Sequence, residues 1–89
     1  PEEASVSEEK LESYVGIYAL SGANLKISIN DGQLKLLVPG QPEYTLIPIK
    51  ENEFVIRGLT GYKVRFEETE EILNMLLIQP NGTFTATKK

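Results

Sequence analysis

The feature that most constrains this chain is a hairpin signature near its middle. Every second residue is apolar from Leu25 to Ile29, and again from Leu34 to Leu36, after the dipeptide Asp31-Gly32. An alternation of period two is typical of a half-buried strand, and glycine accepts the positive φ that a tight hairpin turn needs. The stretch therefore predicts two antiparallel strands joined by a two-residue turn.

The rest of the chain repeats this pattern of short apolar stretches separated by turn residues. Besides the hairpin, the pattern predicts strands at 17–20, 43–49, 54–57, 62–67, 72–79 and 83–87. Short strands with regular turns are typical of a sandwich or barrel, and a closed barrel removes exposed edges. We therefore expect an all-β fold, a small eight-stranded antiparallel up-and-down barrel.

The N-terminal segment predicts a linker and one short helix. Residues 1–6 are acidic and irregular, and we interpret them as a linker from a larger parent protein, with residues 7–89 as a single barrel domain. Ser5 or Ser7 can cap a helix, and Ser5 with Glu8 fits a capping box. Residues Leu11, Tyr14 and Val15 form an apolar stripe that must lie against the sheet, since a helix this short is not stable alone.

Alternation also predicts which side chains face the barrel interior. The predicted inward set is Tyr18, Leu25, Ile27, Ile29, Leu34, Leu36, Leu46, Phe54, Ile56, Val64, Phe66, Leu76, Ile78 and Phe84. A barrel of eight strands is about wide enough for its own side chains or for one small ligand. We expect a dry, filled interior.

Composition excludes several classes of function. The chain has no Cys and no His, so it lacks a thiolate nucleophile, the commonest metal ligand and the usual proton-transfer group at neutral pH. The net charge of −4 argues against nucleic acid as a partner. No stretch approaches the roughly 20 apolar residues of a membrane-spanning helix. We expect no catalytic residue, no metal site, no cofactor and no membrane insertion.

The order of several motifs resembles a known family. The segment Leu11–Tyr18 fits the pattern Leu-x-x-Tyr-x-Gly-x-Tyr, and Pro39–Pro48 fits Gly-Gln-Pro…Leu-x-Pro; residues 64–66 and 79–82 continue the pattern. This order resembles the C-terminal β domain, of unknown function, of bacterial and archaeal serine hydrolases of the β-lactamase and penicillin-binding type. The resemblance implies a lipocalin-like barrel. The resemblance does not decide the compartment, and a parent protein that is exported or associated with the cell envelope is one of the options.

Three functions follow as hypotheses. The resemblance implies a non-catalytic accessory domain that packs on the catalytic domain of its parent hydrolase or mediates assembly. The alternatives are a barrel that binds a small apolar ligand, and a module that self-associates through an unpaired edge near Pro48 or the last strand. The candidate interdomain contacts are Pro39, Gly40, Gln41, Pro42 and Leu59, and the candidate ligand or rim residues are Tyr14, Tyr18, Tyr44 and Tyr62.

Overall fold

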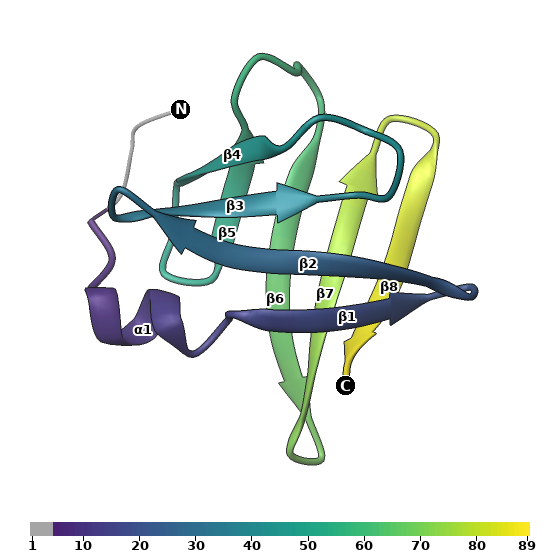
Figure 1. Ribbon diagram of the computed structural model, residues 1–89, viewed down its shortest axis with the longest axis horizontal. Helices are drawn as coiled ribbons and strands as arrows, with labels where there is room; N and C mark the ends of the chain where they lie inside the picture. Colours follow the sequence, from purple (N-terminus) through teal and green to yellow (C-terminus); the bar gives the residue numbers. More distant parts are fainter. Residues whose placement is uncertain (1–4) are drawn as a thin grey trace.

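The computed structural model describes residues 5–89, in which one short helix precedes eight strands (Figure 1). The elements are α1 (Glu8–Glu12), β1 (Gly16–Leu20), β2 (Ala23–Asn30), β3 (Gln33–Leu37), β4 (Tyr44–Pro48), β5 (Glu53–Ile56), β6 (Lys63–Thr69), β7 (Ile72–Gln79) and β8 (Gly82–Lys88). Each strand pairs antiparallel with the next, and β8 returns to β1, so the sheet closes. The predicted eight-stranded barrel is confirmed. Residues 1–4 of the predicted linker lie outside the described residues.

Tight turns set the register between neighbouring strands. Asn30 pairs with Gln33, which leaves Asp31 and Gly32 as a two-residue turn with φ of 57° and 76°. Positive φ at both positions matches the twist of the flanking strands. The hairpin predicted from this dipeptide is therefore confirmed.

The helix α1 closes one end of the barrel. Ser7 is its N-cap and accepts a hydrogen bond from the backbone N–H of Lys10 at 3.2 Å. Ser7, not Ser5, therefore caps the helix, so the predicted capping box of Ser5 with Glu8 is wrong. Leu11 and the following Tyr14 are buried, as the apolar stripe predicted, whereas Val15 is exposed.

The barrel interior contains most of the predicted inward set. Of that set, the buried members are Tyr18, Leu25, Ile27, Leu34, Leu36, Leu46, Phe54, Ile56, Val64 and Phe66, and Ile29 is half-buried against them. The predictions for Leu76 and Ile78 are wrong. In β7 the side chains of Met75 and Leu77 are buried, so Leu76 and Ile78 lie on the outer face.

Phe84 faces inward, as predicted, but it is not buried. It pairs with the inward-facing Leu77, so it lies on the inner face of β8. However, β1 ends at Leu20 and pairs with β8 only at Lys88 and Thr87, within residues 5–89. The N-terminal half of β8 therefore has no neighbour on that side, and 42% of Phe84 remains exposed.

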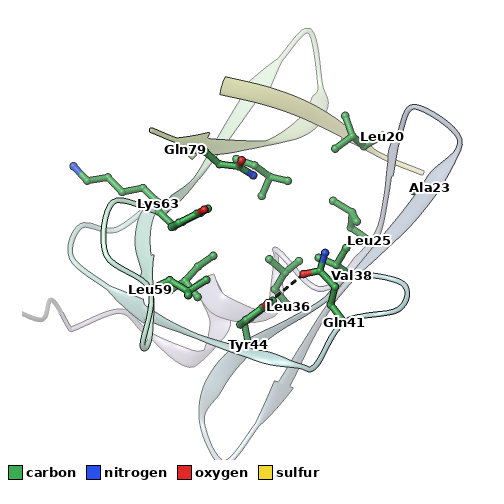
Figure 2. Close-up of a pocket in the computed structure, with 13 residues that line it drawn as sticks. Leu20, Ala23, Leu25, Leu36, Val38, Gln41, Tyr44, Leu59, Lys63 and Gln79 are labelled. Carbon is green, nitrogen blue, oxygen red and sulfur yellow. Dashed lines mark hydrogen bonds between the residues drawn. The ribbon is translucent and has the colours of Figure 1, made fainter. Parts of the chain in front are cut away.

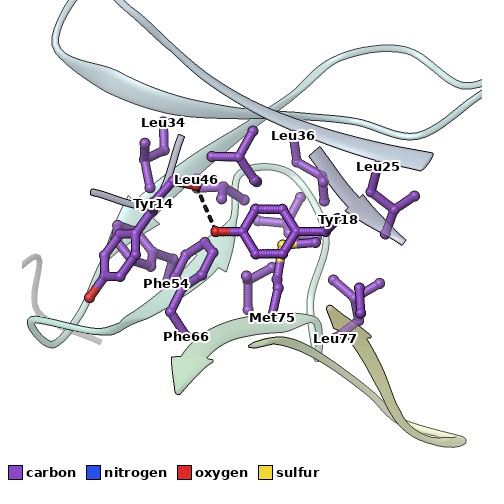
Figure 3. Packing of buried hydrophobic residues seen from close by; sticks show 14 of the residues in the cluster. Tyr14, Tyr18, Leu25, Leu34, Leu36, Leu46, Phe54, Phe66, Met75 and Leu77 are labelled. Atoms are coloured by element: carbon purple, nitrogen blue, oxygen red, sulfur yellow. Dashed lines mark hydrogen bonds between the residues drawn. The ribbon is translucent and has the colours of Figure 1, made fainter. Parts of the chain in front are cut away.

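Aromatic rings fill the end of the barrel that α1 closes (Figure 3). The rings of Tyr14 and Phe66 stack with centroids 4.1 Å apart, and Phe54 meets Phe66 edge-on at 5.7 Å. The Tyr18 hydroxyl donates to the carbonyl oxygen of Tyr14 at 2.7 Å, and burial raises the pKa of Tyr18, with a smaller contribution from Tyr14. This end is therefore filled by its own side chains.

Candidate functional site

The opposite end of the barrel is open and holds a cavity of about 500 Å³, which we call the cup (Figure 2). It is lined by Leu20, Ala23, Leu25, Leu36, Val38, Gln41, Tyr44, Ile56, Leu59, Tyr62, Lys63, Leu77 and Gln79. The prediction of a filled barrel is therefore wrong for this end. The lining of the cup is mainly Leu, Ile, Val and Ala, with the rings of Tyr44 and Tyr62 beside them, whereas the rings of Tyr14, Tyr18, Phe54 and Phe66 pack together at the other end.

The wall of the cup continues the alternation that builds the core. Leu25 and Leu36 face inward from β2 and β3, and Leu77 faces them from β7. Ala23 pairs with Leu20 at the end of the β1–β2 hairpin, where its small side chain leaves the rim wide. The side chains of Leu25, Leu36 and Leu77 are themselves buried, at 2%, 2% and 9% exposed, and form the inner wall of the cup.

A tight turn places Gln41 over one side of the rim. The backbone N–H of Gln41 donates to the carbonyl oxygen of Val38 at 3.0 Å, and Gly40 has φ of 80°. Pro39 at the second position and a glycine with positive φ at the third are the features of a type II turn. The Tyr44 hydroxyl then donates to Oε1 of Gln41 at 3.1 Å, which holds the amide in place (Figure 2).

The loop between β5 and β6 forms the other side of the rim. The backbone N–H of Leu59 donates to the carbonyl oxygen of Ile56 at 3.2 Å, and Gly58 in this turn has φ of 86°. Leu59 is partly exposed, and Tyr62 after it is half-buried. Both side chains line the cup, so this loop adds apolar surface to the rim.

Lys63 lines the cup, but its ammonium group is engaged elsewhere. Nζ of Lys63 lies 3.6 Å from Oε2 of Glu53, and Nε of Arg65 lies 3.2 Å from Oε1 of the same carboxylate. Burial raises the pKa of Glu53, but the hydrogen bond and charge of Arg65, then the charges of Lys63 and Lys50, outweigh it and leave the pKa lowered. The carboxylate thus stays ionised and holds both cations on the outer face.

The structure brings together four of the candidate residues from the sequence. Gln41 and Leu59 from the interdomain set line the cup, together with Tyr44 and Tyr62 from the rim set. Pro39, Gly40 and Pro42 are exposed in the same loop as Gln41. In contrast, Tyr14 and Tyr18 lie in the core at the closed end.

Sequence reasoning missed the residues that complete the rim. Ala23, Val38 and Gln79 lie at the ends of predicted strands, next to turns. Their positions next to turns carry a signal in retrospect, because turns lie at the ends of a barrel. That signal indicates an end of the barrel, but not that the end is open.

A second cavity, of about 730 Å³, lies beside α1 and is more polar. Lys10, Glu51, Glu67 and Glu68 line it, and the Tyr14 hydroxyl donates to the carbonyl oxygen of Glu51 at 3.3 Å. Within residues 5–89 there is no group of three or more acidic side chains that could hold a metal ion. Because the cup is the more apolar of the two cavities, we take it as the candidate site for a small molecule.

Two further findings bear on function. No helix in the described part of the chain is long and apolar enough to cross a membrane. Comparison of the chain with protein-family models, with curated proteins and with solved structures returns no significant match.

Proposed function

We propose that this domain is a non-catalytic binding module that takes a small, largely apolar molecule into the cup. The observation that carries the proposal is the cup itself, an open cavity of about 500 Å³ with mainly leucine, isoleucine, valine and alanine walls. Small-molecule sites are typically concave, mostly apolar and roughly 300–1,000 Å³ in volume, with a few polar groups at fixed positions. Gln41 and Tyr44 supply such groups at the rim.

The chemistry of the lining favours binding over catalysis. Its ionisable side chains are Tyr44, Tyr62 and Lys63, and the lysine is paired with Glu53 outside the cup. Proton transfer needs an acid or base within hydrogen-bond reach of the substrate and with a pKa near the working pH. The lining supports instead a site that removes apolar surface from water, at roughly 25 cal/mol per Å².

Filling the cup tests this proposal. N-phenyl-1-naphthylamine is an uncharged, apolar dye whose fluorescence rises in apolar surroundings, and we expect it to bind the native domain. Ala23→Phe places a ring in the cup and should weaken dye binding at least about tenfold. Ala19→Phe is the matched control, because Ala19 follows the buried Tyr18 and lies on the outer face of the same hairpin.

Two results of this dye experiment decide whether the binding site lies inside the cup. Dye binding that survives Ala19→Phe and is lost in Ala23→Phe supports a site inside the cup. Equal binding by the native domain and by Ala23→Phe would contradict it, provided that urea unfolding shows both variants to be folded.

A second candidate function is that of a lipocalin-like accessory domain of a β-lactamase-type serine hydrolase. The observation that favours it is the position of the candidate contacts: the loop Pro39–Pro42 and Leu59 are exposed and lie on the same rim. A rim built from a proline-bounded turn loses little conformational entropy when it docks. In this alternative the catalytic domain of the parent chain covers the cup.

The parent gene and a titration test this alternative. The gene should encode a serine hydrolase upstream of this domain, with a Ser-x-x-Lys motif. Adding that catalytic domain to the ¹⁵N-labelled barrel should shift the amide signals of Gly40, Gln41 and Leu59. A parent without a hydrolase region, or shifts confined to the closed end, would exclude this function.

A further inference from the structure

The polar groups at the rim of the cup indicate which chemical class of ligand fits it. This inference rests on the proposed binding function and concerns the head group of the ligand. The apolar wall would bury an apolar body, so the head group meets the rim, where the lining residues with polar side-chain groups are Gln41, Tyr44, Tyr62, Lys63 and Gln79.

Gln41 presents a hydrogen-bond donor to the mouth. Its backbone is fixed by the turn from Val38, and its side-chain oxygen accepts the hydroxyl of Tyr44 at 3.1 Å. An amide whose oxygen is engaged in this way keeps its NH₂ group as donor. Figure 2 shows the amide nitrogen of Gln41 on the side away from Tyr44. This donor carries no charge, so it offers a hydrogen bond to a hydroxyl or carbonyl oxygen without adding an ion pair for an anion.

Lys63 does not offer its charge to the cup. Its side chain runs outward from the ring of lining residues (Figure 2), and Nζ lies 3.6 Å from the carboxylate of Glu53. Glu53 is 6% exposed, so taking away one of its cations would leave a buried charge with less compensation. Among the described lining residues Lys63 is the one with a cationic side chain, so an anionic head group finds no free cation there to form an ion pair.

We propose that the cup selects amphiphiles with an uncharged, hydrogen-bond-accepting head and an apolar body, and that Gln41 is the donor to that head. The protein's net charge of −4 acts in the same direction, because it disfavours the approach of an anion to the protein. Long-chain alcohols, esters and amides belong to this class, and fatty-acid carboxylates do not.

Displacement of N-phenyl-1-naphthylamine by decan-1-ol and by decanoate at pH 8 tests the inference, since the two compounds share one chain length and differ in the head. We expect decan-1-ol to displace the dye at a concentration at least about tenfold lower. Equal or tighter binding of decanoate would overturn the inference while leaving the proposed function standing. No dye binding at all would contradict the proposed function itself.

Decan-1-ol and decanoate also differ in water solubility. This difference cancels when the ratio of their two affinities is compared between the native protein and variants of Gln41. Gln41→Met keeps the length of the side chain but removes the donor, and should weaken decan-1-ol several-fold with little effect on decanoate. Gln41→Lys should shift the ratio of the two affinities toward decanoate by about tenfold. Gln33→Met is the matched control, because Gln33 lies beside Leu11, away from the cup. Unchanged ratios in both Gln41 variants would overturn the assignment of Gln41.

Discussion

The turn between β6 and β7 contains the least favourable backbone of the described hairpins. Thr69 pairs with Ile72, so Glu70 and Glu71 form the two-residue turn, with φ of 53° and 67°. Residues with a side chain are uncommon in this left-handed region, and two adjacent carboxylates also repel each other. The turn therefore stores strain that a glycine would release.

Glu71→Gly should therefore stabilise the domain, by about 0.5–1 kcal/mol, because glycine is favoured at the second position of such a turn. Urea unfolding followed by circular dichroism measures the change. Glu68→Gly is the control, since Glu68 lies within β6, where glycine weakens a strand. A loss of stability in Glu71→Gly would contradict the strained turn.

Glu53 makes stability depend on pH. Its pKa in the folded state is lowered from the ordinary value of 4.5, mainly by Arg65 acting against burial. A lowered folded pKa means that the stabilisation is complete above about pH 4.5 and is lost as the pH falls through the folded value. We expect the free energy of unfolding to fall on acidification below this pH.

Glu53→Gln separates this carboxylate from the others. The variant should be less stable than the native domain at pH 7, and the difference should shrink as the pH falls below about 4.5, since the native carboxyl then protonates. Urea titrations of both proteins at several pH values measure the difference. A difference that stays constant over this range would mean that Glu53 does not titrate as inferred.

At the scale of single elements, β7 shows where the sequence pattern fails. The run Leu73–Gln79 contains apolar residues at consecutive positions, so alternation cannot tell which face is inward. The pairing of Val64 with Leu77 and of Phe66 with Met75 decides the register, and this pairing is a tertiary contact. In contrast, β2, β3 and β6 alternate strictly between apolar and polar residues, so the sequence alone predicts which of their faces is inward.

The register of β7 predicts unequal effects of two neighbouring substitutions. Met75 is fully buried, so Met75→Ala should destabilise the domain by about 2–5 kcal/mol. Leu76→Ala, on the outer face, should cost less than about 1 kcal/mol, since surface changes have small effects. Chemical unfolding compares them, and equal losses would contradict the register.

At the scale of the whole molecule, the barrel is filled at one end and open at the other. Alternation predicts whether a side chain faces inward, but not its height along the barrel axis, which depends on the stagger of all eight strands. The rings of Tyr14, Tyr18, Phe54 and Phe66 therefore gather at one end for reasons that no local pattern contains. Closure was predictable from the sequence, and the cup was not.

The rim was partly predictable. Pro39-Gly40 and the glycines around Leu59 mark turns, and turns end up at the ends of a barrel. The sequence places Gln41 and Leu59 in these turns as candidate interdomain contacts, not as residues of a cavity. It does not reveal that both turns lie at the same end, over the same cavity.

Methyl NMR of leucine-labelled protein tests the central claim most directly, because leucines report on both ends of the barrel. Leu20, Leu25, Leu36, Leu59 and Leu77 line the cup, and Leu11, Leu34 and Leu46 lie toward the closed end. On addition of N-phenyl-1-naphthylamine we predict saturable shifts in the first group, with the second group unchanged. Saturable shifts in the second group alone, or none in either, would contradict the account of this domain as an open cup that binds an apolar molecule.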